Sequence, residues 1–317
     1  MSRYIVRRLL LAIPTLLAVS IILFGLLHLA PGGPMAIYAS SPNADPKTLA
    51  EIEQRLGLRD PLPVQYVKWL RGMVTGDWGV SYKYARNVTS VVGERVFPSL
   101  ELMITSLLIA MVLSVPLGVL SAVSRHRWVQ YLSSVFSMLG ISIPTFWLGM
   151  MILLFFSLRL GLLPSGGMDT IGAGFNPWDR LIHLIAPAFV LATLQIAGWS
   201  RYVRSSMLEV VGQDFIRTAR SKGLAERVVI YGHALRNALL PLITMIGMQG
   251  GQLLGGAMVT EVVFSWPGMG RLLADSLAAR DYPVLMGAFM LMSVLVVLGN
   301  LLADIGYAIA DPRIRLE

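Results

Sequence analysis

The chain has 317 residues, of which 55% are hydrophobic and only 14% are charged, and its mean hydropathy is +0.67. A soluble domain carries about 25% charged residues, so the composition excludes an ordinary soluble protein and indicates that much of the chain faces lipid. The net charge of +8 comes from basic residues that flank apolar runs, which favours a role in membrane topology over nucleic-acid binding.

Six apolar runs of transmembrane length predict an all-α membrane protein with six transmembrane helices, a folded extracytoplasmic loop and a helical cytoplasmic loop. The expected spans are Leu9–Ala30, Leu100–Val123, Leu132–Leu158, Leu184–Tyr202, Ala238–Val263 and Val284–Ala310. The chain then divides into an N-terminal segment 1–8, a first span 9–30, an external loop 31–98, a five-helix core 99–310 that contains the cytoplasmic loop 204–237, and a C-terminal segment 311–317. Pro187, Gln195 and Gly198 make the fourth span the weakest pattern, and prolines are expected to kink the second, third and fourth spans, at Pro116, Pro144 and Pro187.

The first span is interpreted as uncleaved. A cleavable signal peptide is the alternative, but its apolar core has 7–15 residues and ends at a small-residue cleavage site. Here the run from Leu9 to Ala30 is longer, and Pro31-Gly32-Gly33-Pro34 follows it.

Positive charge predicts the orientation. With the N-terminus inside, the inner segments hold 14 basic residues, whereas the two short outer loops hold only Arg159, Arg180, Arg271 and Arg280. The positive-inside rule therefore places both termini of this multi-pass membrane protein in the cytoplasm. The external loop is expected to hold two helices, at Asp45–Gly57 and Val64–Met73. Aromatic residues of this loop favour either a partner contact or an interfacial belt: Tyr66, Trp69, Trp78 and Tyr82.

Common catalytic motifs are missing from the sequence. None of the four lysines follows a glycine, so there is no Gly-Lys-Ser/Thr phosphate loop. The histidines are scattered, cysteine is absent, and no G-x-S-x-G motif occurs. We therefore expect no catalytic residue, metal site or cofactor on this chain, and a membrane-embedded enzyme is the disfavoured alternative.

Polar and small residues within the spans are candidates for a transport pathway or gate. Ionisable residues at membrane depth are costly and indicate function by default; the candidates of this kind are Glu261 and Asp304, and the neutral, polar Asn300 is a further candidate beside Asp304. Asn300 and Asp304 share a helix face, and a structural hydrogen bond between helices is the alternative. Gly247, Gly251 and Gly255, with Gln252 beside them, either line the pathway or allow close helix packing.

The cytoplasmic loop predicts a helix, a turn and a second helix. Asp214–Ser221 has helical character with Phe215 and Ala219 as its apolar face, Gly223 is suited to a left-handed cap, and Ala225–Asn237 forms a second amphipathic stretch. Taken alone, such a basic hairpin could instead bind anionic lipid headgroups.

The segment from Asp214 to Leu224 resembles the EAA loop of bacterial ABC importer permeases. Arg217, Thr218, Ala219 and Gly223 fall on the Glu, Ala, Ala and Gly of that pattern, and the two replacements are typical of the peptide/nickel branch. Further stretches resemble the first permease subunit of dipeptide and oligopeptide importers: Tyr4–Leu10, Gly76–Ser81, Ser142–Trp147, His233–Ala238, Glu261–Gly270, Arg280–Pro283 and Asp311–Arg315. Gly33 stands where this family often has Asp.

The resemblance implies a transport subunit without enzymatic activity of its own. It implies a second homologous permease subunit, two ATPase subunits that carry ATP and Mg²⁺, and an extracytoplasmic solute-binding protein. The ATPase-coupling residues would be Asp214, Arg217, Thr218, Ala219, Arg220, Lys222 and Gly223. Di- or oligopeptides are the expected cargo, with nickel, glutathione or another small solute as alternatives, and a scaffold or receptor without transport as a further class.

Overall fold

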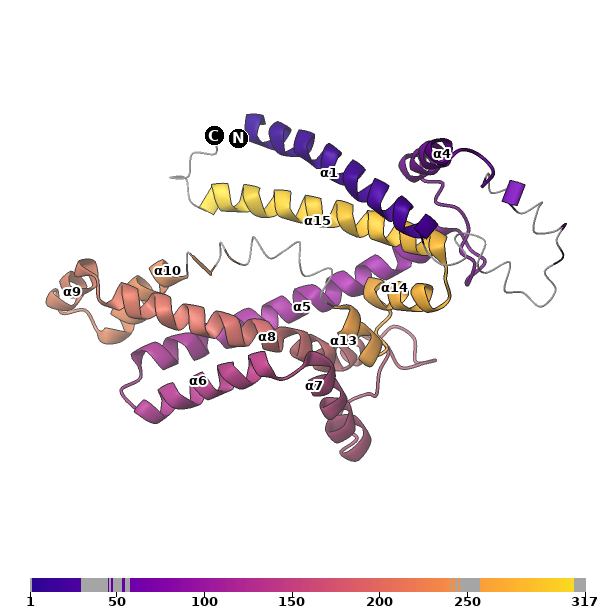
Figure 1. Ribbon diagram of the computed structural model, residues 1–317. Coiled ribbons are helices and arrows are strands. Elements are labelled where there is room, and N and C mark those ends of the chain that lie inside the picture. The colour runs from indigo at the N-terminus through magenta and orange to yellow at the C-terminus, as the bar shows by residue number, and fades with distance from the viewer. Residues whose placement is uncertain are drawn as a thin grey trace.

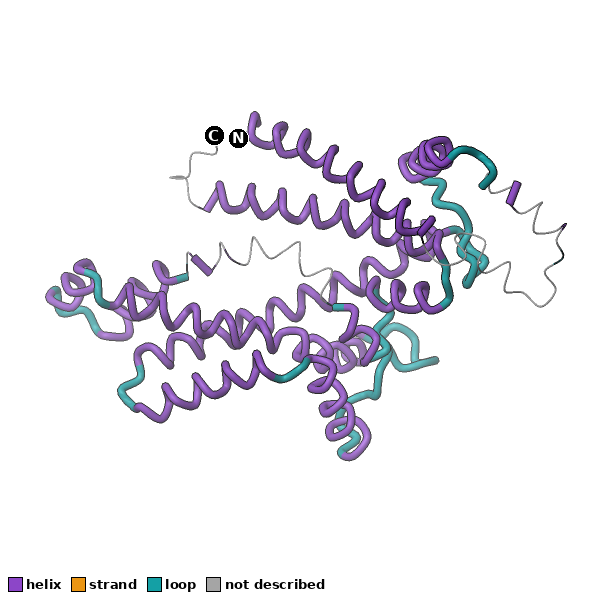
Figure 2. The backbone as a smooth tube through the Cα atoms, viewed as in Figure 1, coloured by secondary structure: helices purple, strands orange, loops and turns teal. Residues whose placement is uncertain are grey.

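The computed structural model describes the backbone of residues 2–29, 45, 47, 53–54, 58–239, 241–242, 245 and 257–310, with side chains over residues 7–301 of these ranges. The described residues are predominantly helical, and their only β-pairing is an isolated bridge between Val80 and Asn87. The long helices run between two ends of the molecule (Figure 1 and Figure 2). We call these the α9 end and the α14 end, after the short helix found at each.

The long helices are α1 (Ser2–Leu29), α5 (Val88–Val123), α6 (Arg127–Ser142), α8 (Pro177–Val211) and α15 (Tyr282–Ala310). The shorter elements are α4 (Leu62–Thr75), α7 (Thr145–Ile152), a π-helical segment η2 (Leu153–Arg159), α9 (Asp214–Ser221), a second π-helical segment η3 (Val228–Ala234), α10 (Leu235–Ala238), α13 (Met258–Val263) and α14 (Met269–Ala278). Four of the described helices are long and apolar enough to cross a membrane, and α6 with α7–η2 makes a fifth candidate span. The expected span Ala238–Val263 lies mostly outside the described residues, so the count of six remains a prediction.

Helix α8 is the centre of the bundle. In its most apolar stretch 61% of the residues are buried, against 6% in α1. As predicted, this span is the least apolar of the four candidate helices, with a mean hydropathy of 1.9, although most of its apolar stretch is covered by protein. A Cβ on Gly118 of α5 would lie 2.6 Å from the Cβ of Val203, and one on Gly140 of α6 would lie 2.9 Å from the Cβ of Ala197. Glycine thus lets α5 and α6 approach α8 closely.

The third expected span is broken rather than straight. Helix α6 ends at Ser142, and the next helix starts at Thr145 with a change of direction of 102°. Pro144 lies at this break, where it cannot donate a backbone hydrogen bond. By contrast, α5 and α8 continue through Pro116 and Pro187 without interruption.

The ends of the helices also extend beyond the hydropathy pattern. Helix α5 begins at Val88, inside the segment expected to form the external loop. Its first turns are helical because Val88 and Val92 pack with Leu272 and Val284 in a core at the α14 end. A hydropathy pattern does not reveal helical turns that are covered by protein, because it detects only apolar runs long enough to cross the lipid.

The external segment packs on the first helix. The expected helix Asp45–Gly57 lies mostly outside the described residues, whereas the expected Val64–Met73 falls within α4. Tyr66 Oη lies 2.8 Å from Ser20 Oγ, and the rings of Tyr66 and Trp69 contact Phe24 of α1. These aromatic side chains therefore join α4 to α1.

Replacing Gly118 with Leu should destabilise the protein, because α5 would be forced away from α8. Overpacking of this kind typically costs about 1–3 kcal/mol. Thermal unfolding of the detergent-solubilised chain measures the effect. Gly93→Leu in the same helix is the matched control, since a Cβ there meets nothing within 4 Å. Equal losses in both variants would contradict the close-packing role.

Candidate functional site

The candidate site at the α9 end is a short helix fixed to the core by one face. Helix α9 carries Asp214 in its first turn and Arg220 in its last, which matches the helix dipole at both ends. Ile216 is fully buried and Ala219 is 7% exposed. Both belong to the hydrophobic cluster that contains Met207 and Val210 of α8. Helix α9 is therefore packed into a core that it shares with η3 and the end of α8, and its main contacts are with η3.

The buried face differs by one residue from the predicted one. Phe215 and Ala219 were expected to form the apolar face, but Phe215 is 41% exposed and Ile216 occupies the buried position. The spacing of Ile216 and Ala219 is i and i+3, which is as compatible with one helix face as i and i+4. Phe215 thus adds an exposed aromatic ring to the outer surface.

A left-handed turn ends the helix, as predicted. Gly223 has φ +75°, and its N–H donates to the Arg220 carbonyl at 3.0 Å. A Cβ at this position would meet no atom within 4 Å. Glycine is therefore required by the backbone conformation and not by crowding within this chain.

Most of the predicted coupling residues lie together on the exposed surface of α9 and its turn. Of the seven, only Ala219 is buried; exposed are Asp214, Arg217, Thr218, Arg220, Lys222 and Gly223. Arg217 Nη1 pairs with Asp214 Oδ1 at 3.2 Å, and Arg220 Nη2 pairs with Glu226 Oε1 at 2.7 Å. The hydrogen bonds from Arg220 lower the pKa of the Glu226 carboxyl below its ordinary value. The pair is therefore charged at neutral pH and weakens only in acid, as pH falls through that lowered pKa.

The second half of the loop returns to α8. It is helical from η3 into α10, within the expected Ala225–Asn237. Val229, Ile230 and Ala234 join the same hydrophobic cluster as α9. Ser206 Oγ of α8 donates to the Ala238 carbonyl at 3.0 Å. Both arms of the loop are thus fastened to α8.

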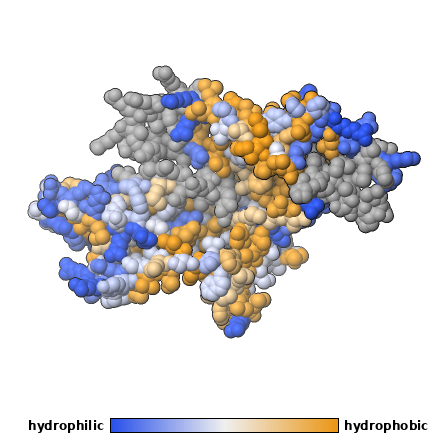
Figure 3. All heavy atoms as spheres, in the orientation of Figure 1, coloured by the Kyte–Doolittle hydropathy of each residue, from blue (hydrophilic) through white to orange (hydrophobic). Residues whose placement is uncertain are grey.

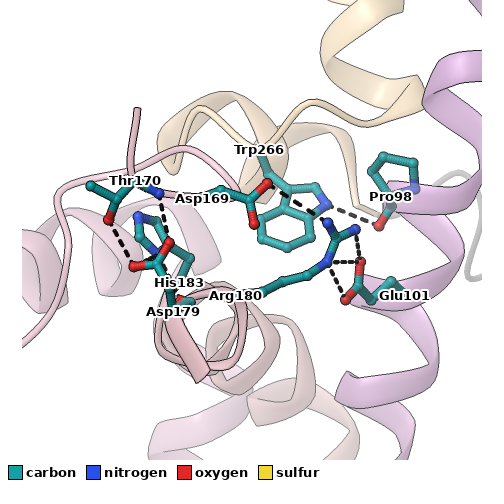
Figure 4. Close-up of polar contacts among 8 residues, drawn as sticks. All are labelled: Pro98, Glu101, Asp169, Thr170, Asp179, Arg180, His183 and Trp266. Carbon is teal, nitrogen blue, oxygen red and sulfur yellow. Dashed lines mark hydrogen bonds and ion pairs between the residues drawn. The ribbon is translucent and has the colours of Figure 1, made fainter. Parts of the chain in front are cut away.

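At the α14 end, an ion-pair network joins the starts of α5 and α8 (Figure 4). Arg180 Nε donates to Glu101 Oε1 at 2.7 Å, and Arg180 Nη2 donates to Glu101 Oε2 at 2.5 Å. These side chains are only 14% and 19% exposed. Arg180 also lies 3.7 Å from Asp169, while Thr170 donates to Asp179 through its N–H and its hydroxyl. The network holds the loop before α8 against both helices.

Glu261, a predicted pathway residue, is instead engaged by the protein itself. Its side chain is 1% exposed, and its carboxylate accepts hydrogen bonds from Ser99 Oγ at 2.6 Å and from the Arg271 N–H at 2.9 Å. The second bond places a negative charge at the N-terminus of α14, where the helix dipole favours it. A Cβ on Gly268 would overlap this carboxylate. The Glu261–Gly270 motif is therefore a compact corner between α13 and α14.

A second buried carboxylate connects two motifs that are 200 residues apart. Asp281 is fully buried and accepts a hydrogen bond from Ser81 Oγ at 2.5 Å. The N–H groups of Tyr82 and Lys83 donate to the same carboxylate at 3.2 and 3.1 Å. The turn before α5 is thereby bound to the start of α15. Sequence reasoning noted both motifs without assigning a role to Ser81 or Asp281.

The other pathway candidates are placed only in part. Gly247, Gly251, Gln252 and Gly255 lie outside the described residues, and so does the side chain of Asp304. Asn300 is exposed on α15. A pathway that joins these residues with Glu261 therefore stays a prediction.

The α14 end also contains an aromatic cavity of about 610 Å³ between α1, α4 and the turn before α5. Phe24, Trp69, Trp78 and Tyr282 are among its lining residues. Its polar groups already bond within the chain: His28 Nε2 lies 3.2 Å from Gln65 Oε1, and Trp78 Nε1 donates to the Met73 carbonyl. The cavity is consequently lined by apolar surface with few free polar groups.

Comparison with known proteins identifies this arrangement. Residues 114–316 match the family described as binding-protein-dependent transport system inner membrane component, and residues 1–102 match the N-terminal family of the same membrane components. The chain belongs to this family of transport-system membrane components. It is accordingly a transport component rather than an enzyme.

Several relatives align with this chain over nearly its full length. It is 46% identical to the oligopeptide transport system permease protein AppB of Bacillus subtilis over 99% of this chain and 100% of the relative. It is 39% identical to the dipeptide transport system permease protein DppB of Alkalihalophilus pseudofirmus over 99% and 100% of the two chains. For the glutathione transport system permease protein GsiC of Salmonella paratyphi A, identity is 41% over the full length of both.

The fold is also found among solved structures. A chain of the MetNI methionine ABC transporter in an inward-facing conformation matches with a TM-score of 0.57, covering 70% of this chain and 96% of that chain at 19% identity. This likeness supports the fold of the transport-system membrane component. It confirms the all-α membrane architecture that the sequence predicts.

Replacing Asp281 with Asn should destabilise the transport component, because an amide nitrogen would face donors in place of a carboxylate oxygen. Loss of a buried charge-assisted hydrogen bond costs about 1.5–3 kcal/mol. Thermal unfolding in detergent measures the loss. Asp275→Asn is the matched control, since Asp275 forms exposed ion pairs with Lys83 and Arg271 and should cost less than about 1 kcal/mol. Equal stability of the two variants would show that Asp281 does not fasten the turn to α15.

Proposed function

We propose that this chain is the permease subunit of an ATP-driven importer, with α9 as the element that receives force from an ATPase. The observation that carries the proposal is the division of α9 into two faces. Ile216 and Ala219 are packed into the hydrophobic cluster that α9 shares with η3 and α8, while charged residues and Phe215 are exposed on the other side. A helix held in this way transmits a push on its outer face to the long helix behind it. Two packings of the bundle, biased through such an element, would suffice for alternating access.

The proposed partners follow from what the chain lacks and from its family. Hydrolysis of ATP would occur, with Mg²⁺, on two ATPase subunits that dock on the exposed face of α9 and the Gly223 turn. A second homologous permease subunit would complete the pathway. A solute-binding protein would deliver cargo at the α14 end, where the Arg180–Glu101, Glu261–Ser99 and Asp281–Ser81 networks brace the surface. In this arrangement the α9 end faces the cytoplasm.

The proposed cargo is a short peptide or peptide-like solute. The relatives at 39–46% identity are named for oligopeptide, dipeptide and glutathione transport. These three kinds of solute share amide bonds and differ in their side chains. Recognition by the binding protein, rather than by this chain, would then select among them.

Substitution at Gly223 tests coupling. Gly223→Val should reduce uptake by about tenfold or more, because a β-branched residue is strained at φ +75° by roughly 1–2 kcal/mol. Uptake and ATP hydrolysis are measured together in proteoliposomes that hold the assembled transporter. Gly223→Asn is the matched control, since Asn tolerates the left-handed region, and it should retain most uptake. Normal uptake by Gly223→Val would contradict the proposal.

Cysteine labelling tests the orientation. Because the natural chain has no cysteine, Thr75→Cys on α4 and Ala225→Cys after α9 each supply a single thiol. An impermeant maleimide should label Thr75→Cys from outside the inner membrane and Ala225→Cys only in inverted vesicles. The reverse pattern would place α9 outside and would exclude an ATPase contact there.

A further inference from the structure

A basic cleft separates α6 from α8 near the α9 end. It consists of two cavities, of about 570 and 260 Å³, that share Ser134 and Arg204. The residues that line the basic cleft are Arg127, Gln130, Tyr131, Ser134, Met138, Arg201, Arg204, Ser205 and Leu208. In Figure 3, hydrophilic residues gather at this end of the molecule, with more apolar surface along the helices beyond it.

Three guanidinium groups converge on the basic cleft without a carboxylate. Among the residues that the structure describes, Arg127, Arg201 and Arg204 form no ion pair, whereas Arg180, Arg217 and Arg220 all do. Arg204 Nη1 donates to Ser134 Oγ at 3.0 Å, which orients it along α6. Each guanidinium offers five N–H donors. The cleft therefore presents concentrated positive charge and many free donors to an anion.

The surroundings of the basic cleft are those of a membrane interface. Trp128 and Tyr131 are 63% and 70% exposed beside it, as amphipathic rings at the lipid–water boundary are. Further along α6, large apolar side chains are exposed: Leu132, Val135, Met138 and Leu139. On α8, Leu208 is exposed in the cleft itself. The positively charged cleft thus lies directly beside an exposed apolar surface of the kind that contacts lipid.

We propose that the basic cleft binds the phosphate headgroup of an anionic phospholipid, whose acyl chains lie along the exposed apolar side of α6. A headgroup phosphate matches the arginine donors, and the tails match Leu132, Val135 and Met138. Basic pockets between helices on the cytoplasmic side are suited to such headgroups. The assignment of the lipid to the cytoplasmic leaflet rests on the proposed function; the binding itself does not.

The location of the basic cleft links this lipid to α9. Arg201, Arg204 and Leu208 lie on the last turns of α8, next to Met207 and Val210, which belong to the same hydrophobic cluster as Ile216 of α9. An anion that bridges α6 and α8 stabilises the pairing of the two helices at the base of α9. Bound lipid should therefore raise the unfolding temperature of the protein by mass action.

The experiment compares phosphatidylglycerol with phosphatidylcholine of the same acyl chains. The full chain, with the subunits that copurify, is delipidated in neutral detergent and titrated with each lipid, and retained lipid and unfolding temperature are recorded. We expect at least about tenfold preferential retention of phosphatidylglycerol by the natural chain. The combined variant Arg127→Gln, Arg201→Gln and Arg204→Gln should lose both this preference and the thermal shift.

Two further variants keep the test specific. Arg59→Gln, Arg71→Gln and Arg159→Gln together remove the same charge away from the basic cleft and should leave the preference unchanged. Arg127→Gln alone keeps the bond between Arg204 and Ser134, so it serves if the combined variant fails to fold, and it should reduce retention by several-fold.

Three outcomes would overturn the proposal. Undiminished retention by the cleft variants would place the lipid elsewhere. Competition by millimolar inorganic phosphate to the same extent as by the lipid would indicate a free-anion site. Loss of the preference on assembly with the ATPase would show that the arginines meet an acidic partner surface. Failure of the proposed orientation would appear in the cysteine labelling and not in this titration.

Discussion

The close approach of α5 and α6 to α8 is the constraint on which the rest of the structure depends. Gly118 and Gly140 remove the side chains that would hold these helices apart. In a membrane, helices gain little from leaving lipid, so packing contact is the main source of association. The buried α8 then carries Arg180 at one end and, at the other, the hydrophobic cluster that includes α9.

The two ends are stabilised by different physical means. At the α14 end, the partly buried carboxylate of Glu101 and the buried carboxylates of Glu261 and Asp281 accept hydrogen bonds from segments far apart in the chain. Such bonds are directional, and leaving one partner unpaired is costly, so this end is braced in one arrangement. At the α9 end, the loop is held mainly by apolar contacts of Ile216, Ala219 and Val229. Its charged groups remain at the surface, where a partner can reach them.

The proposed lipid site and the proposed coupling surface use the same end of α8 in different ways. Coupling would use the side of α8 that shares a hydrophobic cluster with η3 and α9, whereas the basic cleft opens between α8 and α6. A lipid there would act on the helix pairing without competing for the exposed face of α9. The permease would then respond to the composition of its membrane as well as to its ATPase.

The sequence by itself determined the membrane class, the approximate positions of the first, second, fourth and sixth expected spans, the helix Asp214–Ser221 and the left-handed turn at Gly223, because these depend on local hydropathy and local backbone preference. The sequence could not show that Ile216 rather than Phe215 is buried, because in so short a helix either residue can share a face with Ala219. Only the tertiary structure brought Ser81 to Asp281 and Ser99 to Glu261 and made α8, the least apolar of the four candidate spans, the most buried of them. Those features depend on which surfaces meet after folding, and hydropathy measures the polarity of a residue without showing its neighbour.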